Sequence, residues 1–555
     1  MSQKIKARKK KEKKIKLYSN LIIALIIILF ISLFSLYIYN KFFAAKKIES
    51  FFPEESYSFF LIRSNFTSDQ GDKLRKLGLR FGDEKYFQNF LEDLIFPKLR
   101  DQKLDIPEEK FIGWRGDYVA VGNIKLSNIE NIPIFVLEAK NPSLAGEFLK
   151  ILEENLNKRG YVITSEDFRG HKVTSNRGLS EISYAVFDNY LLVSEKSDGV
   201  KKMIDTALGR FTSIYEEENY KTVKKKLSED ESIVFSYFDP LELARSIPFL
   251  NTSAIEPIER VGLRNRSNLR MGMSFIPNEY SIEAKLYSNK NYDSKDKKLK
   301  SKLSFAKKIP QDVLLYFEDN NLQSLIENFL LNSDGDDPEV EIAAMKKLAE
   351  METGIDLDKD LFEHLSENYT LYMLPSSNKE QLDIVSIFEV ENEDKFAENL
   401  NKIENSTLEL LKKTKKGEEI EGRKFTDHNY QNINYRYLNL PDEWNIDLAY
   451  ALIDDYFYIT TSDVASQSAI DVILGRVPEK LADNKIFKDS YNLARNDDSD
   501  QFFYANLQSF IQFMNYHLDF EYENLDRKVK ILESLSFVKE EKRKDNFYNL
   551  FLRVK

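Results

Sequence analysis

The chain has 555 residues, a formal net charge of −11 at pH 7 and no cysteine. The absence of cysteine excludes disulfide bonds and thiol catalysis, so the fold must be held by its hydrophobic core alone. The acidic balance repels phosphate backbones, and we therefore expect no nucleic acid among its partners.

The N-terminal segment has the pattern of a membrane anchor. A basic stub (1–20) precedes nineteen uncharged and mostly apolar residues from Leu21 to Tyr39, and Phe42 and Phe43 follow. A helix of nineteen residues rises about 28 Å, close to the thickness of the hydrocarbon core of a bilayer. A cleaved signal peptide is the alternative, but the apolar run exceeds an h-region of about 7–15 residues.

The anchor determines the predicted location of the protein. The Lys-rich stub predicts a cytoplasmic N-terminus. We therefore expect a single-pass protein of the cell membrane, with a transmembrane helix (21–43) that contacts the lipid bilayer and C-terminal domains that are extracytoplasmic.

The remainder of the chain repeats itself once. YAVFDNYLLVS (184–194) matches YALIDDYFYIT (450–460), and IDTALGR and IDVILGR follow at the same offset. Such a repeat indicates two copies of one fold. The matched positions include Asp105, Asp188, Asp205 and Gly209 in the first copy and Asp356, Asp454, Asp471 and Gly475 in the second. We place the copies at 52–288 and 309–555, joined by a Lys- and Asp-rich linker (289–308).

The first copy begins with a strand after a proline and continues with a helix. This helix starts at Pro142, with Asn141 as its N-cap and Gly160 as its end. The two-residue turn Asp188-Asn189 then predicts a hairpin. Both faces of the hairpin strands are apolar, which indicates a covered sheet.

A helix follows each hairpin and ends at Gly209 or Gly475, where we expect a left-handed residue. Late strands close each copy. Hairpins with helices inserted between them predict an α+β fold. The full architecture is then one N-terminal transmembrane helix followed by two tandem copies of a mostly antiparallel sheet domain with packed helices.

These motifs carry a resemblance to a known family. The Y-A-x-x-D-x-Y hairpin, the I-D-x-x-L-G-R helix end and the G-x-K segments at Gly170 and Gly422 resemble the bacterial domain of unknown function 3352 (DUF3352) family. The resemblance covers nearly all of the chain after the anchor. It implies an exported or membrane-anchored protein, and it assigns no catalytic residue.

Signatures of known catalytic sites are missing from the sequence, which has no P-loop, no G-x-S-x-G and no H-E-x-x-H. The four histidines are too dispersed for local metal-ligand spacing. We therefore predict no catalytic residue, no cofactor and no metal site. The D-x-D-x-D run from Asp356 to Asp360 is similar to a calcium loop, but it lacks the glycine and the final glutamate of that loop, so we favour a structural role.

The two copies differ most before the Y-A-x-x-D-x-Y hairpin. Fourteen positions separate Gly170 from Tyr184, whereas twenty-eight separate Gly422 from Tyr450. The extra positions contain aromatic rings beside amide side chains. Such a combination is typical of surfaces that bind sugars or peptides, so a cell-envelope glycan or protein is the predicted partner. The alternative is a structural hairpin that packs against the other copy. The aromatic residues of the extra segment are Tyr430, Tyr435, Tyr437 and Trp444.

The sequence thus predicts a binding or scaffolding module of the cell envelope. The alternative is an envelope hydrolase that uses carboxylates such as Asp205 and Asp471 in a groove between the copies. Paired carboxylates act as acid and base only when they lie within about 5–10 Å of each other.

Overall fold

The structure is a computed structural model. It describes residues 46–63, 68–82, 108–126, 131–177, 182–228, 231–240, 242–243, 270–289, 305–323, 338–376, 382–413, 420–441, 446–494, 501–517, 531–542 and 545–555. The predicted stub 1–20 and transmembrane helix 21–43 lie outside these residues, as do most of the linker 289–308, Asp105 and Trp444. No helix in the described part of the chain is both long and apolar enough to cross a membrane.

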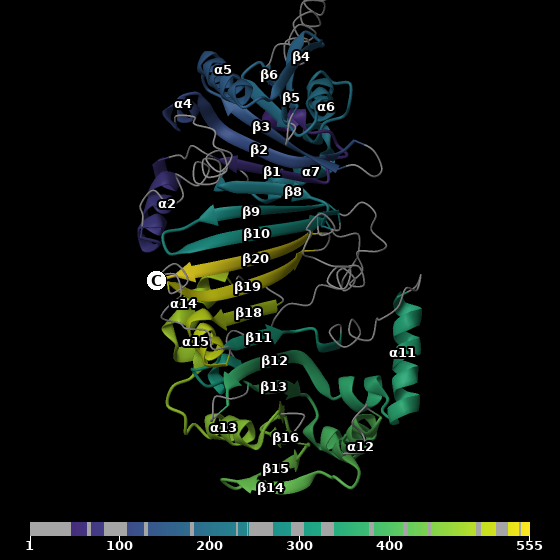
Figure 1. The fold of residues 1–555 in the computed structure, drawn as a ribbon. Coiled ribbons are helices and arrows are strands. Elements are labelled where there is room, and N and C mark those ends of the chain that lie inside the picture. Colours follow the sequence, from purple (N-terminus) through teal and green to yellow (C-terminus); the bar gives the residue numbers. More distant parts are fainter. Residues whose placement is uncertain are drawn as a thin grey trace, which may run out of the picture.

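One antiparallel sheet runs from the top to the bottom of Figure 1 and includes all twenty described strands. In the first half the strand order is β4-β5-β6-β7-β3-β2-β1-β8-β9-β10. The strands of this half are β1 (Ser58–Arg63), β2 (Arg115–Lys125), β3 (Asn131–Ala139), β4 (Val162–Phe168), β5 (His171–Arg177), β6 (Ile182–Phe187), β7 (Tyr190–Ser194), β8 (Val234–Phe238), β9 (Met271–Pro277) and β10 (Ser281–Asn289).

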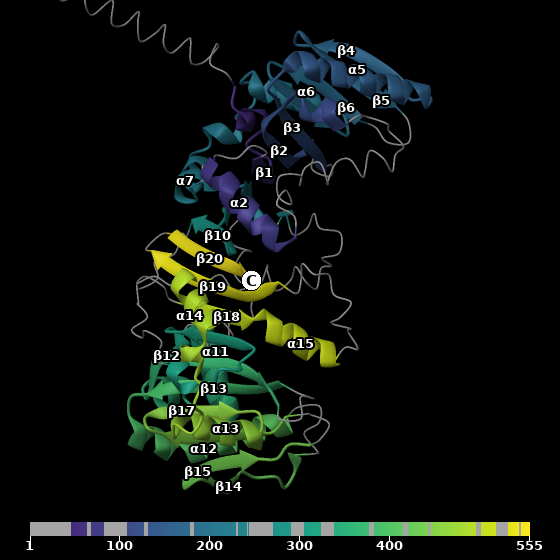
Figure 2. The same cartoon turned by 90° about the vertical axis from the view of Figure 1, so that its left-hand side faces the viewer.

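In the second half the order is β14-β15-β16-β17-β13-β12-β11-β18-β19-β20. The last strands of the two halves, β10 and β20, pair with each other and join the halves into one sheet. Figure 2 shows the halves one above the other with β10 and β20 between them. The strands of this half are β11 (Leu315–Asp319), β12 (Leu365–Pro375), β13 (Leu382–Val390), β14 (Thr426–Tyr430), β15 (Ile433–Leu438), β16 (Leu448–Ile453), β17 (Tyr456–Thr460), β18 (Gln501–Asn506), β19 (Leu532–Lys542) and β20 (Asp545–Val554).

The helices follow the strands in a similar order in the two halves. The first half contains α2 (Ser68–Arg80), α4 (Glu108–Ile112), α5 (Pro142–Lys158), α6 (Ser197–Ala207) and α7 (Glu218–Lys226), with 3-10 helices η1 (Ile48–Phe51) and η2 (Ile214–Glu216). The second contains α11 (Pro338–Thr353), α12 (Glu393–Lys412), α13 (Asp463–Ile473), α14 (Lys485–Ala494) and α15 (Leu507–His517), with 3-10 helices η5 (Phe305–Lys308) and η9 (Leu481–Asp483) and the π-helix η6 (Leu357–Phe362).

The hairpin strands β6 and β7 are covered on both faces, as their apolar pattern predicts. Ala185 and Leu192 belong to the core that contains α6, whereas Tyr184 and Leu191 belong to the core that contains α5. Strands β16 and β17 lie in the same way between α13 and α12. Apolar burial stabilises by about 25 cal/mol per Å², so these cores on both faces of the sheet hold each half without disulfides.

Local signals for the ends of the elements are confirmed. Asn141 Oδ1 accepts a hydrogen bond from the N–H of Leu144 (3.3 Å), Pro142 starts α5, and Gly160 has φ +83°. The hairpin turns also follow prediction, since Asp188 and Asp454 have φ +50° and +51°. The architecture is thus a mixed helix and strand fold built on a large antiparallel sheet.

Candidate functional site

The repeated I-D-x-x-L-G-R motif closes a helix. The N–H of Gly209 donates to the carbonyl of Thr206 (2.9 Å), and the N–H of Arg210 donates to the carbonyl of Asp205 (2.9 Å). This pair of bonds around a left-handed residue is a Schellman ending, which satisfies the last carbonyls of the helix. The second motif makes the corresponding bonds, from Gly475 to Val472 (3.1 Å) and from Arg476 to Asp471 (2.9 Å). Gly209 and Gly475 have φ +75° and +68°, as expected.

The side chains of the two motif acids are paired within their own halves. Asp205 Oδ1 lies 3.2 Å from Arg169 Nε and 3.4 Å from Arg210 Nε, and Asp471 Oδ1 lies 3.6 Å from Arg476 Nη1. Asp205 lies on α6 near one end of the sheet and Asp471 on α13 near the other (Figure 1). The structure therefore assigns them to two separate helix ends and does not bring them into one groove.

The predicted aromatic segment forms the hairpin β14–β15 at one end of the sheet. The hydroxyl of Tyr430 donates to Asp471 Oδ2 (3.0 Å), and that of Tyr435 donates to Asp463 Oδ1 (2.5 Å). Both acceptors lie on α13, and Tyr435 is buried. The hydroxyl of Tyr437 donates to Asp447 Oδ2 (2.5 Å), just before β16.

The environment of these rings is that of a packed interface. Burial, together with the hydrogen bond to Asp463, raises the pKa of Tyr435 to about 12, and the pKa of Tyr437 is raised to about 12 in the same way beside Asp447. Tyr430 and Tyr437 are half-buried against the core under α13. The three rings thus pack as the structural alternative expects, but against a helix of their own half.

The opposite face of the hairpin is held by an ion-pair network. Arg436 makes a bidentate pair with Glu404 of α12, with Nε–Oε1 and Nη2–Oε2 distances of 2.6 and 2.9 Å. Its Nη1 donates to Asp427 (2.7 Å), and the hydroxyl of Tyr450 donates to Glu404 Oε1 (2.6 Å). Charge-assisted bidentate pairs fix orientation as well as distance, so α12 and α13 hold the hairpin on both faces.

The tyrosines lie outside any added segment, whereas the connection that contains Trp444, 439–447 between β15 and β16, is longer than its counterpart 178–181 between β5 and β6. Gly170 forms the β4–β5 turn with Arg169, whereas Gly422 lies before β14 and forms no hairpin turn. The β14–β15 turn is Gln431-Asn432, and both residues have positive φ. The tyrosines therefore lie on a hairpin that has a counterpart, β4–β5, in the first half.

The tip of the β14–β15 hairpin is rich in amides. Asn429 Nδ2 donates to Asn434 Oδ1 across the hairpin (2.6 Å). Charged groups occupy the tip of β4–β5, where Asp167 caps the turn and Arg169 and Lys172 are exposed. The two tips thus differ in the chemistry that they present to solvent. The exposed amides of the second are Asn429, Gln431, Asn432 and Asn434.

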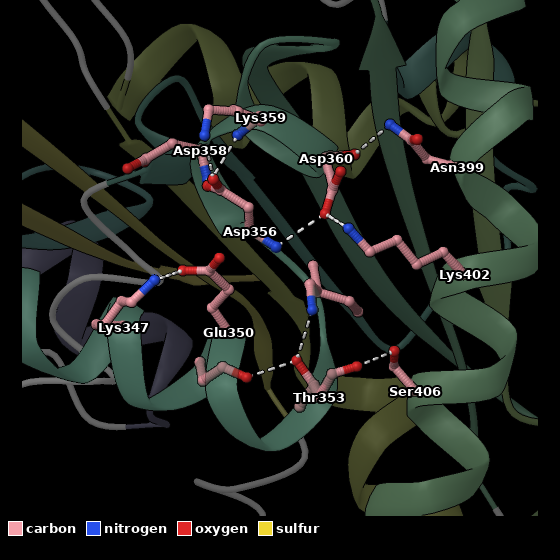
Figure 3. A network of polar contacts seen from close by, with 12 residues as sticks. Lys347, Glu350, Thr353, Asp356, Asp358, Lys359, Asp360, Asn399, Lys402 and Ser406 are labelled. Atoms are coloured by element: carbon pink, nitrogen blue, oxygen red, sulfur yellow. Dashed lines mark hydrogen bonds and ion pairs between the residues drawn. The ribbon is translucent and has the colours of Figure 1, made fainter.

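The D-x-D-x-D segment is a helix start (Figure 3). Asp356 caps η6 by accepting from the N–H groups of Asp358 and Lys359 (3.2 Å each), and its other oxygen pairs with Lys359 Nζ (2.8 Å). Asp360 Oδ2 accepts from the N–H of Asp356 (2.8 Å) and pairs with Lys402. In the described part of the chain, no three His, Asp or Glu side chains are grouped to hold a metal ion.

A buried carboxylate at the end of β11 is missing from the sequence-based candidates. Asp319 is buried and accepts hydrogen bonds from Gln501 Nε2 (2.7 Å), the Tyr369 hydroxyl (3.1 Å) and the N–H of Asn320 (2.6 Å). Burial raises the pKa of Asp319 above its ordinary value. These bonds tie β11 to β12 and β18, which indicates a structural brace. The E-D-N-N run in the sequence indicates only the end of a strand.

A hollow of about 450 Å³ opens in the second half beside the start of α15. Two of its amides already cap helices: Asn484 Oδ1 accepts from the N–H of Phe487 (3.1 Å), and Asn506 Oδ1 accepts from the N–H of Ser509 (3.1 Å). The hollow is thus largely a by-product of two helix starts. Its lining is Gln311, Asp312, Val477, Pro478, Glu479, Asn484, Asn506 and Ser509.

Comparison with known proteins identifies a family. No curated protein matches the chain. Solved structures that align with part of it include crystal form IV of TP0453, with 9% identity, a TM-score of 0.26 and coverage of 45% of this chain and 83% of that one. Crystal form I aligns with 11% identity, a TM-score of 0.25 and coverage of 52% and 86%. These likenesses are too low to carry an argument. The family model described as protein of unknown function DUF3352 matches residues 113–520, and the chain belongs to this family.

Proposed function

We propose that the protein is a single-pass membrane protein whose extracytoplasmic part binds a component of the cell envelope. The basic stub 1–20 and the apolar run 21–43 support the anchor and its orientation. Protease added to intact spheroplasts should then digest the chain after about Ile48 and spare a tag at Met1. Protection of the C-terminal part would contradict this orientation.

The extracytoplasmic part is, in this proposal, an internal duplication with copies at 52–288 and 309–555. The equal strand orders of the two halves support it. The paired turn residues Asp188 and Asp454, and the paired helix ends at Gly209 and Gly475, support it further. Duplicated frames that keep their structural residues are free to differ at their loops and hairpin tips.

We assign binding to the tip of the β14–β15 hairpin, and the partner to a glycan of the envelope. The observation that carries this assignment is the set of four exposed amides on a hairpin that is fixed on both faces. Amides donate and accept hydrogen bonds, as sugar hydroxyls do, without the desolvation cost of a charge. A fixed tip also loses little conformational entropy on binding.

Co-sedimentation of the detergent-solubilised full chain with isolated cell-wall glycan tests this assignment. The double variant Asn429→Ala, Asn434→Ala removes two amides from the second tip. Two lost hydrogen bonds of about 0.5–1.5 kcal/mol each should weaken binding about 5- to 150-fold. The matched control, Asp167→Ala with Lys172→Ala at the first tip, should bind as the wild type does. Equal binding by both double variants would refute the assignment.

A further inference from the structure

The described part of the first half begins three positions after the predicted membrane span. Only Ala44 and Ala45 lie between Phe43, the end of the apolar span, and Lys46, the first described residue. Three Cα steps reach at most about 10 Å. The first half is therefore held close to the bilayer, provided that the proposed anchor is correct.

No flexible spacer follows Lys46. Its carbonyl accepts a hydrogen bond from the Tyr190 hydroxyl (2.8 Å), and Ile48, Phe51 and Phe52 are buried in the first core. The direction in which the chain leaves the membrane is thus coupled to the orientation of the whole first half. One particular surface of that half must face the lipid headgroups.

Three large apolar side chains are exposed near this entry point, next to the charged Glu55, Lys202 and Arg210. Leu208, Phe211 and Tyr215 are 45%, 43% and 38% exposed. Tyr215 lies beside the entering chain, because the N–H of Ile214 donates to the carbonyl of Phe52 (2.9 Å) and Lys47 Nζ lies 5.3 Å from the centre of the Tyr215 ring. Phe211 precedes Thr212, whose carbonyl accepts from the N–H of Glu54 (2.8 Å), and Leu208 lies three positions before Phe211 at the end of α6. We call Lys47, Leu208, Phe211 and Tyr215 the entry patch.

The second half keeps the frame of this patch but not its rings. Leu474 precedes Gly475 as Leu208 precedes Gly209, and it is 40% exposed. However, Val477 takes the place of Phe211 after the L-G-R motif. The second residue of η9 is Ala482, where η2 has Tyr215. At these matched positions, aromatic rings are present in the first half, which is next to the predicted anchor, and absent from the second.

We propose that the entry patch inserts into the headgroup region of the membrane that holds the anchor. Aromatic rings prefer this region because it accommodates an apolar body and a polar edge, and a lysine extends its charge toward the headgroups. The bilayer is the proposed partner, because the short connection between the predicted span and Lys46 keeps the entry patch close to the lipid headgroups. The patch fixes the tilt of the sheet relative to the membrane.

The absence of cysteine from the chain makes this proposal testable at single sites. The full-length variants Leu208→Cys and Phe211→Cys are each labelled at the new cysteine with an environment-sensitive fluorophore. The labelled proteins are then reconstituted into phosphatidylcholine–phosphatidylglycerol vesicles. Leu474→Cys is the matched control, since it has similar exposure and the same motif. Lipids that carry a doxyl quencher near the headgroup should quench the two patch labels about twofold or more at an insertion depth of about 5–10 Å, and should leave the control unchanged.

The outcomes separate the patch from the anchor. If the chain leaves the vesicles on alkaline washing, the proposed anchor fails and the patch proposal fails with it. If the chain stays but the label at Leu208 or Phe211 is quenched no more than the label at Leu474, the anchor stands and the patch proposal is refuted. In the Leu208→Cys chain, adding Phe211→Asp should relieve the quenching while the chain stays on the vesicles; unchanged quenching would also refute the role of the ring.

Discussion

Gly475→Ala should destabilise the end of α13 by about 1 kcal/mol, through backbone strain alone. Gly475 has φ +68°, and a Cβ built on it would meet no atom within 4 Å. No steric clash therefore contributes to the cost. The left-handed conformation costs an alanine about 1–2 kcal/mol. Alanine also lowers the conformational entropy of the unfolded chain, which stabilises the folded state and offsets part of this cost.

Hydrogen–deuterium exchange read by mass spectrometry measures this cost locally. A change of about 1 kcal/mol should accelerate exchange of the α13 amides about fivefold, if they exchange by local opening. Helix α6 of the same molecule ends in the same motif at Gly209 and is the internal control. In the Gly209→Ala variant, amide exchange should accelerate in α6 and stay unchanged in α13. Gly146→Ala in α5, at a helical position with no atom near its Cβ, should instead slow exchange there. Unchanged exchange in α13 would refute the role of the left-handed glycine.

Three further outcomes follow from buried groups. Burial raises the pKa of Asp383, so the charged carboxylate destabilises the fold above that pKa. The difference in the free energy of unfolding between the wild type and Asp383→Asn, measured by urea unfolding, should therefore shrink as the pH falls through the pKa of Asp383. A difference that stays constant with pH would contradict this. Tyr435→Phe should lower the free energy of unfolding by about 1–3 kcal/mol at pH 7, because it removes the hydrogen bond to Asp463. The wild type should lose this extra stability as the pH rises through about 12, the pKa of Tyr435. Equal stability of the two proteins at pH 7 would contradict a role for this bond. With the buried Trp114 replaced by phenylalanine, Trp444 is the remaining fluorophore; a shift of its emission when cell-wall glycan is added would support the binding role that the sequence predicts for Trp444, and no shift would refute that role.

Features that depend on local chemistry were predictable from the sequence. The cap at Asn141, the helix ends at Gly209 and Gly475 and the turns at Asp188 and Asp454 depend on one residue and its immediate neighbours. Each of these residue types lowers the energy of one backbone conformation, so the sequence indicates the conformation directly. The apolar pattern on both faces of the hairpin strands likewise predicts the two covering helices.

Features that depend on contacts between distant segments were not predictable. The turn of the β14–β15 hairpin forms at Gln431-Asn432, which contains no glycine and which no sequence motif indicated. Tyr430 and Asp471 are 41 positions apart and meet only because β14 lies over α13. For the same reason, residues that look like a binding set in the sequence are divided in the structure between a packed face and an exposed tip.

The pairing of β10 with β20 has a consequence for biogenesis. The first half can assemble as soon as β10 has been synthesised, yet β20, the strand that covers its open edge, follows every other described strand in the chain. Until then the edge offers unpaired backbone groups, which can recruit another chain. The proposed N-terminal anchor would keep nascent molecules on the membrane during this interval, where neighbours are numerous. Glu283 and Lys285 form an ion pair along β10, and charged residues of this kind protect an open edge until its partner strand arrives.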